Sequence, residues 1–477
     1  MKKPTPTMGF KNKKDVLGLV IVDGVGFRNF ILSNFFKEAN QQYEKVVIFS
    51  GLPKRVYSGF VFGDVSIEEL DDFKEPSSTW FFRKIKEIAH LRENSKNNFG
   101  ISDNLKANHP EKMNRRGLLT RFIYLITYFF HSEYWIDKYY SLQQWSFKTH
   151  STTQKYDRLL KMHSPDVLFF THQRPPYIAP LIYAANKQGI ATACFIFSWD
   201  NLASKGRMAG DFDKCLVWSK LMEKELLQFY PKIKPQQIQV VGTPQFEPYV
   251  MEAYKTSKEI FYKKFDLDRE YKTLCYSCGD ISTSKNDELY IATIAKLIQQ
   301  NSFDQQLNFL VRTSPAEDGQ RFEKVKQEFS FIKWNTPEWV ISRENHSEPW
   351  SQRVPAINDM KDLRAILNFC DVGINMCSTM SLDFMHFNKP VINPVFGNEN
   401  NGLYNDGRFL NYAHYKRVAE SGSVSIAKNK KELKEAIVAA LEQPLLQQKE
   451  RNQILDLQLG KPLEGTGTRI ANALANE

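Results

Sequence analysis

Three hydroxyl side chains, those of Ser378, Thr379 and Ser381, lie together at the start of the segment 377–390. Apolar runs of strand length flank this segment, so the hydroxyls stand where a strand turns into a short helix. In the first turn of a helix the backbone N–H groups lack partners within the helix, and beside Ser or Thr hydroxyls they suit a phosphate. The same residues would also serve as a helix cap, and the two roles are compatible. The segment predicts a phosphate or diphosphate site, as a nucleotide-type ligand would need.

Other residues that suit such a ligand follow the preceding strands. In an open parallel sheet, ligands bind beyond the carboxyl ends of the strands. Gly279 and Arg312 each follow an apolar run, and the loop 397–402 follows a third. An arginine at a strand end would neutralise a diphosphate whose charge grows as its bond breaks. The alternative is a salt bridge to a carboxylate, and we expect the phosphate contact.

In the first half of the chain, Asp23, Gly24 and Gly26 end the first apolar run. Glycine has no Cβ, so the backbone there can approach a ligand closely. The third glycine of a dinucleotide fingerprint is absent, and Asn29 stands in its place. The segment therefore does not predict an NAD site, and we expect no cofactor.

Strands and helices alternate in both halves, which predicts an α/β protein with parallel sheets. The first half opens with a strand at 15–23, a helix at 27–39 and a strand at 45–49. A mostly helical insertion at 65–150 interrupts it, and the alternation resumes near 165. A chain of 477 residues is also too long for one ordinary core. We expect a basic tail at 1–14, a first domain at 15–246, a linker at 247–272, a second domain at 273–445 and closing helices at 446–477.

From about residue 15 onward, this order of elements resembles that of the GT-B glycosyltransferases. The specific parts are the segment 377–390, the Val-Gly-Thr-Pro junction at 241–244, and 265–269 leading into the strand and turn 274–280. Bacterial surface-polysaccharide glycosyltransferases and the related CDP-glycerol glycerophosphotransferases are the nearest comparisons within that superfamily.

Three positions carry the resemblance of the segment 377–390. In the family, an acidic residue is followed five positions later by glycine and seven later by proline, and here Asp383, Asn388 and Pro390 fill those places. Asp383 is shorter than the family's glutamate, which commonly binds ribose hydroxyls. Asn388 replaces the glycine, and asparagine tolerates the left-handed backbone that such a turn requires.

The resemblance implies two Rossmann-like, doubly wound domains that face each other across a cleft, with the final helix at 465–474 crossing back to the first domain. It places the donor nucleotide on the second domain, held by Gly279, Arg312, Ser378, Thr379, Ser381 and Asp383. It places the acceptor on the first domain, beside Asp23, Gly24, Gly26, Asn201 and Lys205.

Catalysis would depend on residues that follow strands of the first half. Transfer with inversion needs a base for the acceptor hydroxyl, and Asp200 or His172 would serve, whereas retention needs no such base. The alternatives are that Asp200 caps a turn and that His172 is a hydrogen-bonded core residue. His414 is placed either near the cleft or in a surface loop. No Asp-x-Asp pair occurs at a strand end other than the one at 266–268, which lies in the linker, so we expect no essential metal.

Charge and cysteine content indicate which kinds of binding partner and which cellular compartment to expect. The net charge of +10 favours anionic partners such as nucleotides or phospholipid surfaces, and we expect no nucleic acid partner. The six cysteines lie in or beside apolar runs, as buried free thiols do, and this favours a reduced, cytoplasmic location. The basic and aromatic segment 112–145 would lie either in a membrane interface at the inner face or in the core.

These observations favour an enzyme that moves a sugar from a nucleotide-sugar donor to a hydroxyl of a bacterial surface glycan or a lipid-linked acceptor. Three alternatives remain: a CDP-glycerol-type glycerophosphotransferase, a sugar-nucleotide epimerase of the same architecture, and a non-catalytic GT-B binding module. The first is weakened because the Arg312 turn continues as Thr-Ser-Pro, where a His-Pro would support it.

Overall fold

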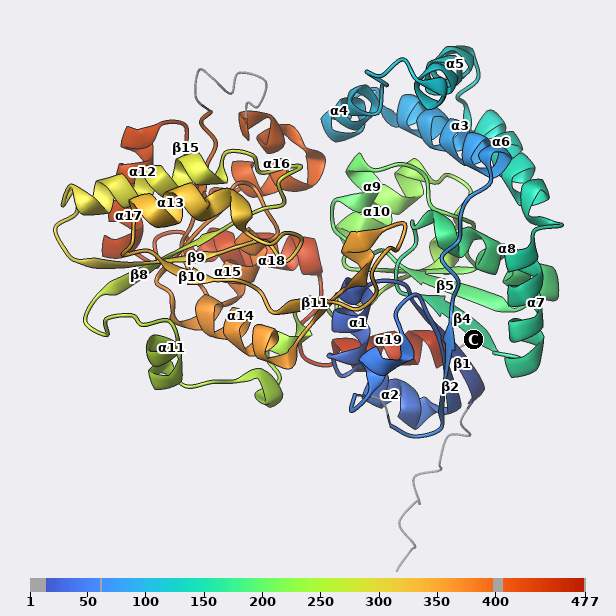
Figure 1. Cartoon of the computed structure of the whole chain (residues 1–477), viewed down its shortest axis with the longest axis horizontal. Helices are drawn as coiled ribbons and strands as arrows, with labels where there is room; N and C mark the ends of the chain where they lie inside the picture. Colours follow the sequence, from blue (N-terminus) through green and yellow to red (C-terminus); the bar gives the residue numbers. More distant parts are fainter. Residues whose placement is uncertain (1–13, 61, 398–405, 476–477) are drawn as a thin grey trace, which may run out of the picture.

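The computed structural model describes residues 14–60, 62–397 and 406–475. They form two α/β domains, each built on one parallel sheet and joined side by side (Figure 1). Residues 1–13 of the expected tail and 398–402 of the expected loop lie outside the described residues. The two-domain α/β architecture expected from the sequence is confirmed.

The first domain contains a seven-stranded sheet in the order β3-β2-β1-β4-β5-β6-β7. Every neighbouring pair runs parallel, and the chain order reverses between β1 and β4. Such a reversal is the switch point at which doubly wound sheets bind ligands. The strands are β1 (Lys14–Ile21), β2 (Tyr43–Ser50), β3 (Val65–Glu69), β4 (Val167–Phe170), β5 (Ala191–Phe195), β6 (Lys214–Val217) and β7 (Ile238–Val240).

The second domain contains a six-stranded parallel sheet in the order β10-β9-β8-β13-β14-β15. Its switch point lies between β8 and β13. Most of these strands are apolar runs buried on both faces, as expected when helices cover both sides of a sheet. The strands are β8 (Lys272–Ser277), β9 (Leu307–Arg312), β10 (Lys333–Asn335), β13 (Val372–Ile374), β14 (Val391–Pro394) and β15 (Ser425–Ala427).

The first helix departs from the sequence-based expectation of one helix at 27–39. The structure has two helices, α1 (Gly24–Ile31) and α2 (Phe35–Gln42), with a break between them. The break accommodates α19 (Thr466–Ala475), because a Cβ on Gly467 would lie 2.4 Å from the backbone nitrogen of Phe35. Glu247 joins the two segments by accepting hydrogen bonds from Asn34 N and Gly467 N. The final helix therefore crosses back to the first domain, as expected.

The expected helical insertion begins with a strand, β3, which extends the first sheet at its edge. After it come four helices, α3 (Ser77–Asn94), α4 (Phe99–Ala107), α5 (Arg115–Phe129) and α6 (Glu133–Phe147). Helix α3 packs against the other three, and the group lies along the outer edge of the first domain (Figure 1). Helix α7 (Ser151–His163) then leads into β4.

An arm of the second domain, residues 336–356, reaches over the first domain. It consists of the antiparallel strands β11 (Trp339–Ile341) and β12 (Arg353–Pro355) with a short 3-10 helix (Pro349–Gln352) between them. The Gln352 amide donates to the carbonyl of Gly51, and Arg343 pairs with Glu69 at 2.9 Å. These contacts place the arm over the carboxyl ends of β2 and β3. The sequence did not predict it, because three-residue strands carry almost no periodic signal.

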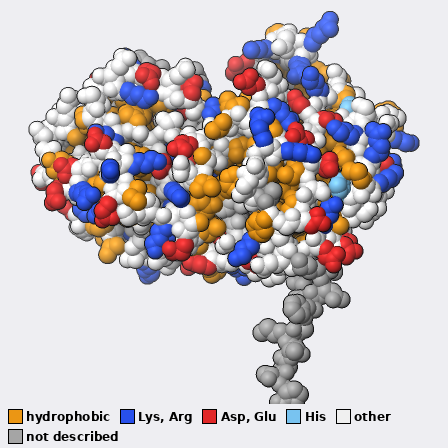
Figure 2. Space-filling view, turned by 60° about the horizontal axis from the view of Figure 1, so that its bottom comes forward, with side chains coloured by type: hydrophobic (Ala, Val, Ile, Leu, Met, Phe, Trp, Pro, Cys, Tyr) orange, Lys and Arg blue, Asp and Glu red, His pale blue; other side chains and the backbone are white. Residues whose placement is uncertain are grey.

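The hydrophobic core continues from one domain into the other. The larger buried cluster fills the first domain and extends into α14 (Ile357–Phe369) and α15 (Met380–His386) of the second, while a smaller one lies within the second domain. In Figure 2, hydrophobic side chains gather over the junction, and the outline is notched between the two lobes. The remaining helices are α8 (Ala179–Gln188), α9 (Asn201–Ser204), α10 (Lys220–Phe229), α11 (Lys258–Lys264), α12 (Asp287–Gln299), α13 (Glu323–Glu328), α16 (Ala413–Glu420), α17 (Lys430–Glu442) and α18 (Gln448–Leu459).

Candidate active site

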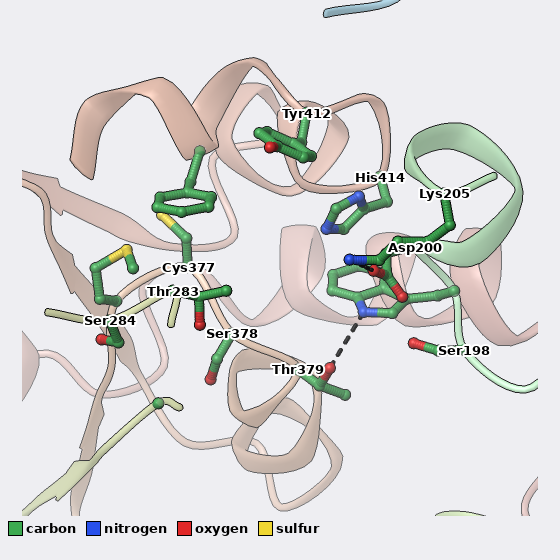
Figure 3. Close-up of a pocket in the computed structure, with 14 residues that line it drawn as sticks. Ser198, Asp200, Lys205, Thr283, Ser284, Cys377, Ser378, Thr379, Tyr412 and His414 are labelled. Atoms are coloured by element: carbon green, nitrogen blue, oxygen red, sulfur yellow. Dashed lines mark hydrogen bonds and ion pairs between the residues drawn. The ribbon is translucent and has the colours of Figure 1, made fainter. Parts of the chain in front are cut away.

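A cavity of about 260 Å³ lies between the domains, at the switch point of the second sheet (Figure 3). The segments after β8 and β13 form one wall, and the loop between β5 and α9 forms the other. Five of the residues expected at the site line it together: Asp200, Lys205, Gly279, Ser378 and Thr379. His414, which the sequence placed only ambiguously, lines it as well.

The wall from the second domain is rich in hydroxyl groups. Asn375 holds the turn after β13, because its Oδ1 accepts hydrogen bonds from Ser378 N at 2.9 Å and from Ser378 Oγ at 3.2 Å. Cys377 takes a left-handed backbone, with a φ of 49°, and so allows the sharp turn from strand to helix. Ser378 and Thr379 then face the cavity, on the same side as Thr283 and Ser284 (Figure 3). Hydroxyls from two strand ends thus converge on one space, as a phosphate group would require.

A buried carboxylate supports this wall from behind. Asp287, at the start of α12, accepts hydrogen bonds from Gly279 N at 2.9 Å and from Ser284 Oγ at 2.5 Å. Burial raises the pKa of Asp287 to about 6, although the hydrogen bonds and the nearby Arg321 oppose the rise. Arg321 pairs with it at 3.0 Å. The loop after β8 is therefore held in place by a network below the cavity.

The wall from the first domain carries a pair of opposite charges. Lys205 Nζ lies 3.5 Å from Asp200 Oδ2, and among the described lining residues Lys205 alone has a permanent positive charge. Burial by itself would raise the pKa of Asp200, but the charge of Lys205, that of His414 when its ring is protonated, and a hydrogen bond from Ser198 hold it well below its ordinary value. Asp200 therefore remains ionised at neutral pH and is a weak base.

His414 lies between Asp200 and the aromatic rings at the top of Figure 3. Its ring packs edge-on against Trp199, with centroids 4.9 Å apart. Burial lowers the pKa of His414 to about 4, although Asp200 opposes this, so the imidazole is neutral at pH 7. Its buried Nδ1 has no hydrogen-bond partner within the described part of the chain. A neutral imidazole that lines the cavity could accept a proton from a hydroxyl bound there.

Aromatic side chains close the cavity. Phe409 and Tyr412 line it, with ring centroids 5.5 Å apart, and the Tyr412 hydroxyl donates to Asp103 on α4 at 2.6 Å. The indole N–H of Trp199 donates to Thr379 Oγ1 at 3.1 Å and thereby joins the two walls. Rings in these positions could stack on a base or a sugar.

Arg312 lies outside this cavity, contrary to the expected diphosphate contact. Its guanidinium is buried and makes two hydrogen bonds of 2.9 Å to Asp359, which is also buried, and a third to Asn335. The salt bridge that was the alternative is what the structure contains, and both charges in it are buried. A guanidinium held on these three acceptors is not available to a ligand.

Ser381 and Asp383 also face away from the cavity. Ser381 Oγ is bonded to Tyr415 Oη at 2.7 Å and to Asn375 Oδ1 at 3.1 Å, below the turn. Asp383 accepts a hydrogen bond from Tyr249, and burial raises its pKa to about 6. The expected ribose contact from Asp383 does not fit this buried position. Asn388 has a φ of 55°, which is the left-handed backbone expected there.

The remaining expected residues form a separate cluster in the first domain. Asp23 caps α1 by accepting from Gly26 N at 2.7 Å, and its other oxygen lies 2.9 Å from His172 Nδ1. His172 stacks on Phe197, with centroids 3.8 Å apart, which is the environment of a hydrogen-bonded core histidine. Asn201 is buried and accepts from the Gln173 amide.

Gly24 allows a close approach, but to the chain itself. A Cβ at Gly24 would lie 1.7 Å from the carbonyl oxygen of Arg353 in the arm. The close approach that this glycine allows is thus made by the arm of the second domain. The arm covers the switch point of the first sheet, which leaves that of the second for a ligand.

Sequence reasoning missed Thr283, Ser284, Phe409 and Tyr412, all of which line the cavity. The first two follow β8 by six and seven positions, and their position after a strand end was the available signal. Phe409 and Tyr412 follow the end of β14 by 15 and 18 positions, which is too far for a strand-end signal to mark them. Among the described residues, no group of three His, Cys, Asp or Glu side chains is placed to hold a metal ion.

Comparisons with known proteins place this geometry among solved folds. No protein-family model matches the sequence, and no curated protein matches it. The UDP-GlcNAc 2-epimerase from Neisseria meningitidis, solved with UDP-GlcNAc bound, superposes with a TM-score of 0.53 at 9% identity, over 97% of this chain and 100% of that one. The enzyme from Methanocaldococcus jannaschii gives 0.52 at 11% identity, over 97% and 100%. Identities this low establish the architecture alone: the chain has the GT-B fold.

Proposed function

We propose that the protein is a glycosyltransferase that moves a sugar from a nucleotide-sugar donor to a hydroxyl acceptor, in the cavity between its domains. The observation that carries the proposal is the difference between the two walls. The second domain offers hydroxyls at two strand ends and the neutral His414 on α16, and the first domain offers an ion pair that faces them. The hydroxyls suit a diphosphate, and the histidine beside the ion pair suits a hydroxyl that must lose a proton.

On the donor side, Ser284, Ser378 and Thr379 would hydrogen-bond the diphosphate, and Lys205 would balance its charge. The Lys205 ammonium is partly exposed and only loosely paired with Asp200, so it can turn towards an anion. As the bond to the sugar breaks, charge builds up on the diphosphate, and a cation held nearby stabilises that state.

On the acceptor side, His414 would take the proton from the attacking hydroxyl, if the transfer inverts the sugar carbon. Its low pKa keeps the imidazole in the neutral form that a base requires. Asp200 would stabilise the imidazolium that results, because it stays ionised and its charge acts on His414. We propose a bacterial surface glycan or a lipid-linked precursor as the acceptor.

A second candidate is a sugar-nucleotide epimerase, and the solved 2-epimerases of the same architecture favour it. An epimerase inverts a carbon of the sugar and needs no acceptor. Incubation with a nucleotide sugar alone, followed by NMR of the sugar, separates the two candidates. A new epimer formed without acceptor would replace the glycosyltransferase proposal, whereas an unchanged sugar favours it.

The donor is found first, by thermal shift with UDP, GDP, CDP and CMP conjugates, CDP-glycerol among them. A ligand that binds the folded state raises the melting temperature by an amount that grows with the logarithm of its concentration relative to its Kd. Transfer from the stabilising nucleotide sugar to glycan or lipid-linked acceptors is then measured. Stabilisation and turnover by CDP-glycerol would instead indicate a glycerophosphotransferase. Binding without turnover of any donor would indicate a non-catalytic module.

A further inference from the structure

Helix α5 presents its more apolar face to solvent. Leu118, Phe122, Leu125 and Phe129 are spaced to share one face of the helix, and each is between 51% and 67% exposed. The face packed against the protein carries Gly117, Thr120, Ile123 and Thr127 instead. A helix of a globular protein normally has the opposite arrangement, with its large apolar side chains turned inward. Neither the core nor the proposed cavity accounts for this stripe.

The exposed face continues past the end of the helix. Phe129 contacts Phe130, Phe130 contacts Trp135 at 4.7 Å between ring centroids, and Trp135 contacts Tyr134. Tyr134 is itself exposed. An apolar stripe therefore leads into a cluster of aromatic rings, and such rings are enriched where a membrane meets water.

The charges on α5 indicate which partner covers this face. The helix contains three arginines and no acidic residue, and Arg115 and Arg116 are exposed in its first turn, next to the exposed Lys112. Positive charge at a helix N-terminus opposes the helix dipole, so these arginines do not serve the helix itself. Together with an apolar stripe they match an anionic lipid surface, which attracts basic residues and accepts apolar ones.

The insertion links this face to the cavity. Helices α4 and α5 both pack on α3, and α4 reaches the cavity wall through Asp103, which binds Tyr412, and Asn104, which donates to the carbonyl of Ser204. No helix in the described residues is long and apolar enough to cross a membrane, so α5 would lie along a surface. Figure 1 shows α5 at the outer end of the first domain, with α4 between it and the second domain.

We propose that α5 and the turn that follows it dock the protein on an anionic membrane surface, with Leu118, Phe122, Leu125 and Phe129 in the interface and Arg115 and Arg116 at the lipid headgroups. This docking holds the cavity at a fixed position relative to the lipid. The inference does not depend on the proposed activity, because vesicle binding requires no substrate.

The test is co-sedimentation of the whole protein with vesicles of phosphatidylcholine alone and of an equimolar mixture with phosphatidylglycerol. Two variants address the two parts of the surface: Phe122→Ser with Leu125→Ser and Phe129→Ser, and Arg115→Gln with Arg116→Gln. Matched controls lie on the other domain: Leu445→Ser with Leu446→Ser, and Lys430→Gln with Lys431→Gln, all at exposed positions. Melting temperatures verify that every variant is folded.

We expect the wild type to bind the mixed vesicles at least 10-fold more tightly than the neutral ones, and less tightly as salt rises. The affinity of each α5 variant for the mixed vesicles should be about 10-fold or more below that of the wild type, and each control should bind like the wild type. Equal binding by the α5 variants and the wild type, or no binding by any, would overturn the proposal. So would a wild-type dimer that the serine variant converts to a monomer, because the face would then be covered by a second copy.

Discussion

Replacing Arg312 with Met removes one half of the buried ion pair at the end of β9. The guanidinium makes two hydrogen bonds of 2.9 Å to Asp359 and one to Asn335, and both charged side chains are almost fully buried. Without it, the hydrogen bonds that remain to the Asp359 carboxylate within the described residues come from the Trp339 indole and from Glu338 N. Breaking a buried pair leaves an uncompensated charge and costs about 3–5 kcal/mol of unfolding free energy.

The measurement is urea unfolding followed by tryptophan fluorescence, together with nucleotide-sugar binding under native conditions. For a urea dependence of about 3 kcal/mol per molar, the loss lowers the midpoint by about 1 M or more. Adding Asp359→Asn to the Arg312→Met protein should recover most of the lost stability, because the amide is neutral and its oxygen still accepts the hydrogen bond from the Trp339 indole. Lys431→Met is the control, since it breaks a fully surface-exposed pair with Glu435 and should cost about 1 kcal/mol or less.

The opposite pattern would refute this reasoning. An Arg312→Met protein with an unchanged midpoint and no nucleotide-sugar binding would mean that the arginine contacts the diphosphate after all. It would also mean that the pairing with Asp359 is replaced when ligand binds. Loss of stability without loss of binding by the folded fraction is the result we expect.

Three further predictions concern other positions. Lys205→Gln should weaken nucleotide-sugar binding about 10- to 100-fold, because a charge-assisted hydrogen bond contributes about 1.5–3 kcal/mol. The melting temperature should not change, because the pair with Asp200 is loose. Calorimetry measures the affinity, and an unchanged affinity would exclude the lysine from the site. Asp383→Asn should stabilise the protein by up to about 3 kcal/mol near pH 8 and little near pH 4. The Asp383 carboxyl has a pKa of about 6 in the folded protein against an ordinary 3.8, so the stability that its protonated form gives the wild type is lost as pH rises through 6. Urea unfolding at the two pH values measures the gain, and an equal gain at both would contradict the prediction. Gly24→Ala should loosen the arm and raise hydrogen exchange at 339–355, because its Cβ would overlap the Arg353 carbonyl. Gly206→Ala should have no such effect, because the atoms nearest to its Cβ belong to Glu87 and lie 3.4 Å or more away.

The catalytic assignment makes a prediction for the pH dependence of turnover. With His414 as the base, activity should be flat near neutral pH and fall as pH drops through about 4, where the imidazole gains a proton. His414→Asn should lower turnover about 100-fold or more, with little effect on donor affinity. A profile that falls near the ordinary histidine pKa of 6.5 would indicate another base.

Local signals predicted the sheets well, because a continuous apolar run of strand length identifies a strand covered on both faces. They also placed Ser378, Thr379, Gly279 and Asp200 correctly after such strands. What they could not supply was the partner of each polar side chain. The pairing of Arg312 with Asp359 and the contact of Gly24 with Arg353 join residues far apart in the sequence, and in both cases a polar or small residue at a strand end serves the protein rather than a ligand.

Helix α19 has a consequence for how the first domain forms. It packs on α2, and the carbonyl of Ala473 accepts a hydrogen bond from Lys214. The Arg469 side chain donates a hydrogen bond to the carbonyl of Val241. The first domain is therefore completed by residues more than two hundred positions beyond its last strand. During synthesis, the face of α2 stays open to water and to chaperones until residues 466–475 have been made. A fragment ending near residue 246 should be prone to aggregation, and adding 466–475 as a separate peptide should reduce it.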